Sequence, residues 1–162
     1  MSVDEKGPHK ATLGWREWAS LPELGIEAVK MKIDTGARTS ALHAFSIETF
    51  DESGKRKVRF GIHPLQRRKD VEIFCVADVV DERTVSDSGG HKEKRLVIIT
   101  PIVIGNEKLD VEFTLTDRDS MRFRALLGRT AMEGRFIVDP GASFLSGKEI
   151  RHQYMKTLKG AK

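Results

Sequence analysis

The stretch Ile33-Asp34-Thr35-Gly36-Ala37 decides how the rest of this chain is interpreted. It directly follows Val29-Lys30-Met31-Lys32, so apolar side chains recur at every second position up to Ile33. That period is typical of a half-buried β-strand, because successive side chains of a strand point to opposite faces. Asp34 is therefore predicted to lie at the end of a strand, in a turn that contains a glycine.

Each residue after Ile33 suits a carboxylate that activates water. Asp34 would be the base, and Gly36 lacks the Cβ that would keep its backbone N–H away from the carboxylate. The Thr35 hydroxyl can anchor one loop against another, and Ala37 is small enough to let a substrate pass. A plain β-turn is the alternative, because Asp-x-Gly is common in loops.

Further alternations of apolar and polar residues predict more strands, at residues 45–47, 58–62, 71–79 and 111–115. Turn-forming residues separate these strands, at positions 51–54, 87–90 and 105–106. The best helical signal is short, from Arg129 to Glu133 between two glycines. Regular strands and scarce amphipathic helices favour an all-β barrel or sandwich.

A chain of 162 residues, 39% of them hydrophobic, is expected to form one domain. Residues 1–12 are interpreted as a disordered lead-in, residues 13–150 as the domain and residues 151–162 as a basic C-terminal tail. The net charge of +4 resides in this tail, which holds four basic residues and no acid. A solvated terminus is the preferred interpretation, and weak contact with an acidic partner or RNA is the alternative. For residues 143–162 a terminal helix and a tail both stay open, and Phe144, Leu145, Ile150 and Tyr154 could anchor part of this segment.

The remaining composition predicts a soluble, cytoplasmic protein without a membrane segment. The longest apolar run, residues 96–104, is interrupted by Thr100 and Pro101. Cys75 is the single cysteine, so it excludes an intramolecular disulfide, and its apolar surroundings predict a buried thiol. No cofactor is expected, and ATP dependence has no support because no phosphate-binding Gly-x-x-x-x-Gly-Lys sequence occurs.

A second motif follows the Asp-Thr-Gly segment later in the chain. The segment Ala125-Leu126-Leu127-Gly128-Arg129-Thr130 resembles the apolar-apolar-Gly-Arg segment of retroviral and related aspartic proteases, and residues 33–42 resemble their active-site loop. Residues 83–92 lie where those proteases carry a substrate-covering flap, although an ordinary tight turn is the alternative. The combination resembles a bacterial retropepsin-like family, once labelled ATP-dependent zinc proteases and sometimes encoded beside or fused to ATP-grasp ligases that add glutamates to a ribosomal protein.

This resemblance implies a retropepsin-like closed barrel, one lobe per chain, with one short helix after the Gly-Arg motif. It implies a peptide or protein substrate and a possible ATP-grasp ligase partner. An insertion at residues 45–80 would account for the long spacing between Asp34 and Gly90. The site residues that it implies are Asp34, Thr35 and Gly36 for catalysis and Ala37, Arg38, Ser88, Gly89, Gly90 and Arg129 for substrate binding.

Two carboxylates must share one proton in an acid protease, and this chain offers one Asp-Thr-Gly. The segment Asp139-Pro140-Gly141-Ala142 looks like a second copy but lacks the threonine, and only 23 residues follow Asp139. Too little chain remains for a second lobe. A homodimer is therefore expected to supply the second Asp34, with residues 136–138 as a terminal strand at the interface.

Four arginines suggest a preference for acidic peptides. Retroviral enzymes usually have an acid at the position of Arg38, whereas here Arg38 and Arg129 are both basic. With Arg122 and Arg124 they are hypothesised to leave positive charge near the cleft. The alternative is that these arginines pair with acids elsewhere. Trimming of glutamate tails is a substrate guess that rests on the family alone.

Two other classes of protein compete with a protease. A zinc enzyme is disfavoured, because the histidines are dispersed and no His-Glu-x-x-His occurs, so no metal ligands are predicted. A catalytically silent β-barrel adaptor that binds a glutamate ligase, a ribosome or RNA is the second rival. An adaptor would tolerate Asp34→Asn, whereas a protease would not. Nucleic acid is otherwise not expected as a partner.

Overall fold

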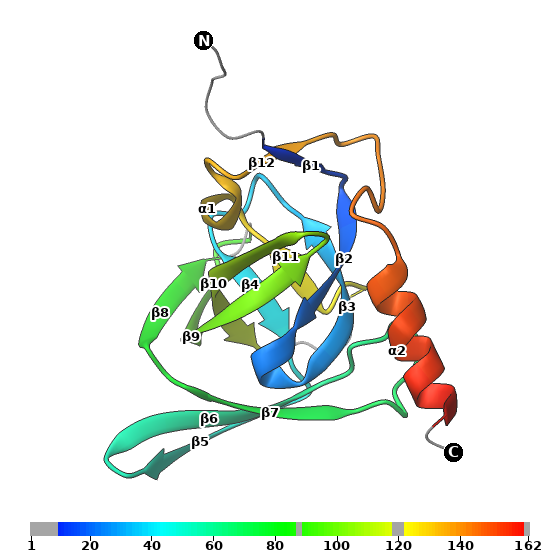
Figure 1. Cartoon of the computed structure of the whole chain (residues 1–162). Coiled ribbons are helices and arrows are strands. Elements are labelled where there is room, and N and C mark those ends of the chain that lie inside the picture. Colours follow the sequence, from blue (N-terminus) through cyan, green and yellow to red (C-terminus); the bar gives the residue numbers. More distant parts are fainter. Residues whose placement is uncertain (1–9, 87–88, 118–121, 161–162) are drawn as a thin grey trace.

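The computed structural model describes residues 10–86, 89–117 and 122–160, and most of these residues form strands (Figure 1). A six-stranded closed barrel is the main unit. Its strands, in barrel order, are β10 (Glu107–Thr116), β4 (Ser40–His43), β11 (Ala125–Leu127), β3 (Ile26–Ile33), β2 (Arg16–Leu21) and β9 (Lys92–Ile104). Pairing of β9 with β10 closes the sheet on itself, and the predicted all-β closed barrel is confirmed.

The barrel is mixed, since β4 runs parallel to β10 and β11 runs parallel to β3, whereas the other barrel pairs are antiparallel. In the register of β11 and β3, Ala125 lies opposite Met31 and Leu127 opposite Ile33. Residues that follow Leu127 therefore emerge beside Asp34, and residues that precede Ala125 lie beside the earlier part of β3. This register determines which arginines come near Asp34.

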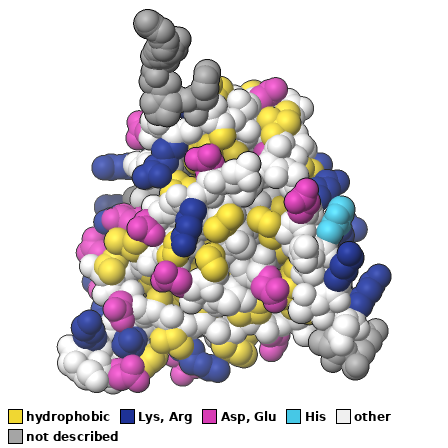
Figure 2. Space-filling model, viewed as in Figure 1, with side chains coloured by type: hydrophobic (Ala, Val, Ile, Leu, Met, Phe, Trp, Pro, Cys, Tyr) yellow, Lys and Arg dark blue, Asp and Glu magenta, His cyan; other side chains and the backbone are white. Residues whose placement is uncertain are grey.

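Side chains that point into the barrel form the core. On β3 the apolar residues predicted to alternate are buried, with Met31 fully so, while Lys32 is exposed. The largest fully buried side chains include Phe113, Leu42, Ile98 and Leu115 of the barrel strands, and Phe60 from outside the barrel packs against them. On the face shown in Figure 2, basic and acidic side chains are interspersed with hydrophobic ones over the barrel.

A separate three-stranded sheet occupies the predicted insertion. It consists of β5 (Ser46–Glu52), β6 (Lys55–Ile62) and β7 (Ile73–Asp78), and its hairpin extends away from the barrel in Figure 1. Ser53 and Gly54 connect β5 to β6 with φ of 53° and 79°, the left-handed values of a tight hairpin turn. Cys75 of β7 is 2% exposed, which confirms the prediction of a buried thiol.

The N-terminal boundary differs from the prediction. The lead-in was expected to reach residue 12, but β1 (Ala11–Leu13) pairs in parallel with β12 (Phe136–Val138). The alternation of β1 is too short to be recognised without its partner, which lies more than a hundred residues away. Strand β12 was predicted as a terminal strand, and it pairs within the chain.

At the C-terminus the structure contains a helix, which the sequence left open as the alternative to a tail. Residues 151–160 belong to α2 (Glu149–Gly160), which packs on β2 and β3. Tyr154 is buried in a small cluster with Trp18, Ala28 and Leu65. A helical spacing of Ile150, Tyr154 and Leu158 supplies the apolar face. Three of the four basic residues, Arg151, Lys156 and Lys159, therefore occur on a packed helix and not on a solvated tail.

Two shorter helices complete the chain. Helix α1 (Arg129–Met132) follows the Gly-Arg motif as predicted, and η1 (Pro22–Leu24) connects β2 to β3. No helix in the described ranges is both long enough and apolar enough to cross a membrane.

Candidate active site

Asp34 emerges from the end of β3, where β11 holds it. Its backbone N–H donates to the carbonyl oxygen of Leu127 at 2.9 Å. Its side-chain Oδ1 accepts from the N–H of Gly36 at 3.0 Å and from that of Ala37 at 3.1 Å. Oδ2 accepts no hydrogen bond within the described part of the chain. One oxygen is therefore fixed while the other is available to water, and Asp34 is partly exposed.

Gly36 allows this close approach of backbone to carboxylate. A Cβ at position 36 would lie 3.3 Å from Asp34 Oδ1, closer than most Cβ contacts. Thr35 lies on the exposed part of the loop, and its carbonyl oxygen accepts from Arg129 Nη1 at 3.3 Å. Among the described residues its hydroxyl makes no hydrogen bond, so it remains available to another chain.

The Gly-Arg motif supports the Asp34 loop from behind. The N–H of Gly128 donates to Ser40 Oγ at 3.0 Å, and the N–H of Arg129 donates to the Ala37 carbonyl at 2.7 Å. Thr130 donates twice to the Arg38 carbonyl, from its N–H at 3.1 Å and its hydroxyl at 2.9 Å. The two motifs singled out in the sequence thus form one unit. The roles of Ser40 and Thr130 were missed, because a short polar side chain beside a motif gives no signal of its own.

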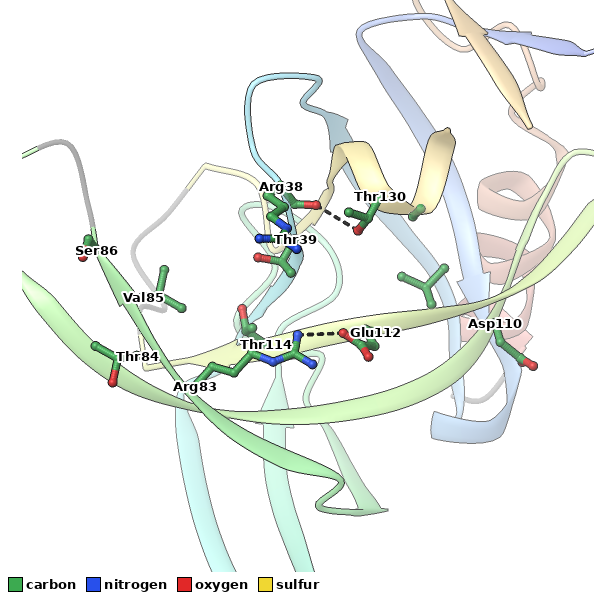
Figure 3. A pocket seen from close by; sticks show the side chains of 12 residues that line it. Arg38, Thr39, Arg83, Thr84, Val85, Ser86, Asp110, Glu112, Thr114 and Thr130 are labelled. Carbon is green, nitrogen blue, oxygen red and sulfur yellow. Dashed lines mark hydrogen bonds and ion pairs between the residues drawn. The ribbon is translucent and has the colours of Figure 1, made fainter. Parts of the chain in front are cut away.

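A cavity of about 800 Å³ lies between the loop on one side and strands β8 (Asp81–Ser86) and β10 on the other, where β8 forms a hairpin with β9 (Figure 3). Arg38 and Thr39 line it from the loop, and Arg83 and Val85 line it from β8. Asp34 itself is not among the lining residues.

The hairpin and the barrel meet across this cavity. Arg83 Nη1 lies 2.7 Å from Glu112 Oε1 on β10, as drawn in Figure 3. At the hairpin tip, Ser88 lies outside the described residues. Gly89 and Gly90 follow it, and Gly90 has φ of 84°, which favours glycine.

The four arginines do not gather at one place. Arg38 and Arg129 both belong to the loop and its support, whereas Arg122 and Arg124 line a different cavity together with Lys30. The hypothesis of a single cluster is wrong for Arg122 and Arg124. They precede β11, and the parallel register places them beside the earlier part of β3.

Asp139 adopts a turn like that of Asp34 outside the barrel. The N–H of Gly141 donates to Asp139 Oδ1 at 3.0 Å, and the N–H of Asp139 donates to the Leu13 carbonyl at 2.8 Å. Its flanking strands are β12 and β1, which form a sheet of two strands. The described chain therefore holds one barrel with one Asp-Thr-Gly loop.

Histidines do not form a metal centre in the described ranges. No group of three or more His, Cys, Asp or Glu residues there could hold a metal ion. His63 Nε2 lies 3.3 Å from Glu72 Oε2, and its ring stacks on Phe45 with centroids 4.3 Å apart. His43 is buried in β4.

A closed six-stranded barrel, an Asp-Thr-Gly loop at a strand end and a Gly-Arg segment behind it define the retropepsin-like class of proteins. Residues 12–149 match the RimB-like family, described as retropepsin-like aspartic endopeptidase RimB. The chain belongs to this family.

A solved structure supports the same class. Lpg0085, a Legionella pneumophila protein with unknown function (DUF785), is 27% identical, with a TM-score of 0.71 over 85% of this chain and 99% of that one. The described barrel is thus also the fold of a protein solved independently.

Curated relatives carry the similar segment within longer chains. Proteins named probable alpha-L-glutamate ligase are 43% identical in Shewanella pealeana, over 93% of this chain, and 43% identical in Desulfotalea psychrophila, over 86%. The matched part is 34% and 30% of those proteins, so the chain spans about a third of their length.

Proposed function

We propose that this chain is an aspartic endopeptidase that acts as a homodimer, with Asp34 from each copy at the shared site. The observation that carries the proposal is the Asp34 carboxylate, with Oδ1 held by two backbone N–H groups and Oδ2 open. Such a carboxylate is oriented and can still contact a water molecule. Family membership supports the same chemistry.

The reaction needs two carboxylates that share one proton. The ionised Asp34 accepts a proton from water as the water oxygen attacks the peptide carbonyl carbon. The protonated Asp34 of the other copy donates to the carbonyl oxygen, which gives a neutral tetrahedral intermediate. Its collapse breaks the C–N bond, with a proton passing to the leaving nitrogen. The pair titrates as a unit.

A homodimer with twofold symmetry follows from this requirement, because one barrel supplies one Asp34. The exposed Thr35 hydroxyl, which has no partner among the described residues, is suited to contact the other copy. Ile137 of β12 is 55% exposed, and we place this strand pair at the dimer contact. Burial of an apolar side chain there would favour association.

Acidic peptides are the proposed substrates, and glutamate-tailed proteins are the proposed natural form. Arg38 lines the cavity between the Asp34 loop and strands β8 and β10, and Arg129 lies on the support of the same loop. The relatives named probable alpha-L-glutamate ligase make a glutamate-adding ligase a reasonable partner. We place the reaction in the cytoplasm, where such ligases would act.

The proposal is tested by mass-spectrometric analysis of a peptide library, including glutamate-rich members, between about pH 4 and 8. Wild type is compared with Asp34→Asn, and Asp139→Asn serves as the control because its turn is similar but lies outside the barrel. Cuts made by wild type and Asp139→Asn but not by Asp34→Asn support the proposal. Cuts that persist in Asp34→Asn contradict it, and no cuts by any variant favour the adaptor.

A further inference from the structure

A second cavity, of about 610 Å³, is lined mainly by cations, and we call it the basic pocket. Its cations come from β2, β3, α2 and the two segments at residues 66–68 and 122–124. No acidic side chain is among the described residues that line it. The cations are Arg16, Lys30, Arg67, Arg68, Arg122, Arg124 and Arg151, and the other lining residues are Trp18, Leu65, Gln66 and Met155.

Most of these cations lack a neutralising partner. Arg68 forms a two-bonded ion pair with Asp70, at 3.0 Å and 2.9 Å. In the described part of the chain, no ion pair with a carboxylate is made by Arg16, Lys30, Arg67, Arg122 or Arg151. Burial lowers the pKa of Lys30, and the nearby arginines 16, 122, 151 and 67 lower it further. Uncompensated repulsion of this kind is typical of sites that bind an anion.

Aromatic rings hold several of the cations in place. The Arg16 guanidinium lies 4.7 Å from the centroid of the Trp15 ring, and its Nε donates to Ser143 Oγ at 3.2 Å. Lys30 Nζ lies 5.9 Å from the Trp18 centroid, and the Arg151 guanidinium lies 5.7 Å from it. The positive groups are therefore oriented before a ligand arrives, which lowers the entropy cost of binding.

We propose that the basic pocket binds an acidic stretch of polypeptide through several side-chain carboxylates. Guanidinium groups match carboxylates with paired hydrogen bonds, and a chain of acidic residues presents many of them. Binding of an acidic polypeptide does not depend on the proposed protease function. Only the further step, that this polypeptide is a substrate, rests on that function. The pocket would then be a second contact surface, distinct from the Asp34 loop.

The composition of the pocket favours a peptide over a nucleic acid. Trp18 is only 6% exposed, and it already contacts Lys30, Arg151 and Phe144, so it offers little ring face on which a base could stack. Outside the pocket, the other 21 Lys and Arg residues of the chain are outnumbered by 24 Asp and Glu residues. The rest of the chain therefore carries a net negative charge, which does not favour a long contact with a phosphate backbone.

The distance between the basic pocket and Asp34 is short enough for one polypeptide substrate to contact both. Lys30 lies on β3, and Asp34 directly follows the end of this strand, four residues later. At the rise of a β-strand, four residues separate the backbones of Lys30 and Asp34 by about 13 Å. An extended peptide covers that straight distance in about four residues. An acidic tail held in the pocket would therefore keep nearby parts of the same polypeptide close to the Asp34 loop.

Binding is tested on the full chain with Asp34→Asn, so that no cleavage interferes. A fluorescently labelled peptide of ten glutamates is titrated at low and at physiological salt, with fluorescence anisotropy as the readout. Arg67→Asn with Arg122→Gln removes two exposed charges, and Asn suits the φ of 66° at position 67. Lys55→Gln with Lys108→Gln is the control, with the same charge change at exposed sites on β6 and β10.

We expect the pocket variant to raise the Kd at least about tenfold and the control to raise it less than about threefold. Equal effects of the two variants would show unspecific attraction and overturn the proposal. Tighter binding of a uridine RNA decamer than of the glutamate decamer, with the same sensitivity to the pocket variant, would also overturn it, in favour of nucleic acid.

Tryptophan fluorescence provides a second measurement of binding, and it requires no substitution in the pocket. The two tryptophans of the chain, Trp15 and Trp18, both contact pocket cations, so the glutamate peptide is expected to change their intrinsic fluorescence. Unchanged fluorescence at saturation contradicts the proposal. Because binding is measured without Asp34, failure of the protease proposal leaves this result unaffected.

Discussion

The backbone N–H of Asp34 donates a 2.9 Å hydrogen bond to the carbonyl oxygen of Leu127, and this bond joins the two motifs of the chain. Strands β3 and β11 run in parallel, so both motifs emerge at the same end of the barrel. The Gly-Arg segment then supports the Asp34 loop by further hydrogen bonds to the loop backbone. The position of the carboxylate therefore depends on residues far away in sequence.

Gly128→Ala is expected to destabilise the fold and displace the Asp34 loop. An added Cβ would lie 2.5 Å from the Thr39 carbonyl carbon and 3.0 Å from the Ser40 nitrogen, which are backbone atoms that cannot rotate away. Such overpacking costs about 1–3 kcal/mol of unfolding free energy. Thermal unfolding measures it, with Gly160→Ala as control because its Cβ meets nothing within 4 Å. Equal melting temperatures for the Gly128 variant and wild type would contradict the described packing.

Glu17→Gln is expected to lower the unfolding free energy by about 2–5 kcal/mol. The buried Glu17 carboxylate accepts from the N–H groups of Gly14, Leu145 and Ser146 at 2.7, 2.9 and 3.0 Å, and from the Ser146 hydroxyl at 2.6 Å. A glutamine would turn an NH₂ group toward N–H donors in either orientation. Chemical denaturation measures the loss, and the exposed Glu23→Gln is the control. A loss no larger than that of the control would rule out this anchoring role.

Cys75 is expected to resist alkylation in the folded protein. Burial raises the pKa of its thiol from 9.0 to about 12, so at pH 8 the reactive thiolate is roughly a thousandfold scarcer than in an exposed cysteine. The folded state retains the proton longer than the unfolded state, so this group stabilises the fold below pH 9 and loses that contribution between pH 9 and about 12.

A thiol reagent with and without guanidinium provides the measurement for Cys75. The thiol should react promptly only after unfolding. Prompt reaction of the native chain at pH 8 would show that β7 opens readily.

Arg38→Glu is expected to reduce the preference for acidic over neutral peptides by about tenfold in kcat/KM, because it reverses a charge that lines the cavity between the Asp34 loop and strands β8 and β10. Competition between two peptides that differ only in Glu or Gln next to the cut measures the preference. Lys55→Glu, with the same charge change on the separate sheet, is the control. An unchanged preference would disprove a role for Arg38 in selecting acidic peptides.

Local patterns were sufficient to predict the elements that carry the site. The alternation before Asp34 predicts β3, and Gly128 and Gly134 bound the short helix α1. These features are encoded within a few residues, so a single sequence reveals them.

Distant contacts explain what could not be predicted. Strand β1 is stabilised by β12, and α2 by its packing on Trp18 and Ala28, so neither boundary is visible locally. The basic pocket gathers cations from separated segments, and the net charge of +4 does not reveal it because a charge count carries no information on position. Arg122 and Arg124 were assigned to the wrong place because their position depends on the register of β11 with β3.

Mixing wild-type and Asp34→Asn chains tests most directly whether two copies share one site. Equal amounts are unfolded together, refolded and assayed for peptide cleavage, with each chain also refolded alone. If every active unit needs Asp34 from both copies, random pairing leaves about one quarter of the chain pairs active. Activity at about a quarter of that of the same total amount of wild type is the predicted result, and activity at about half would contradict the shared site.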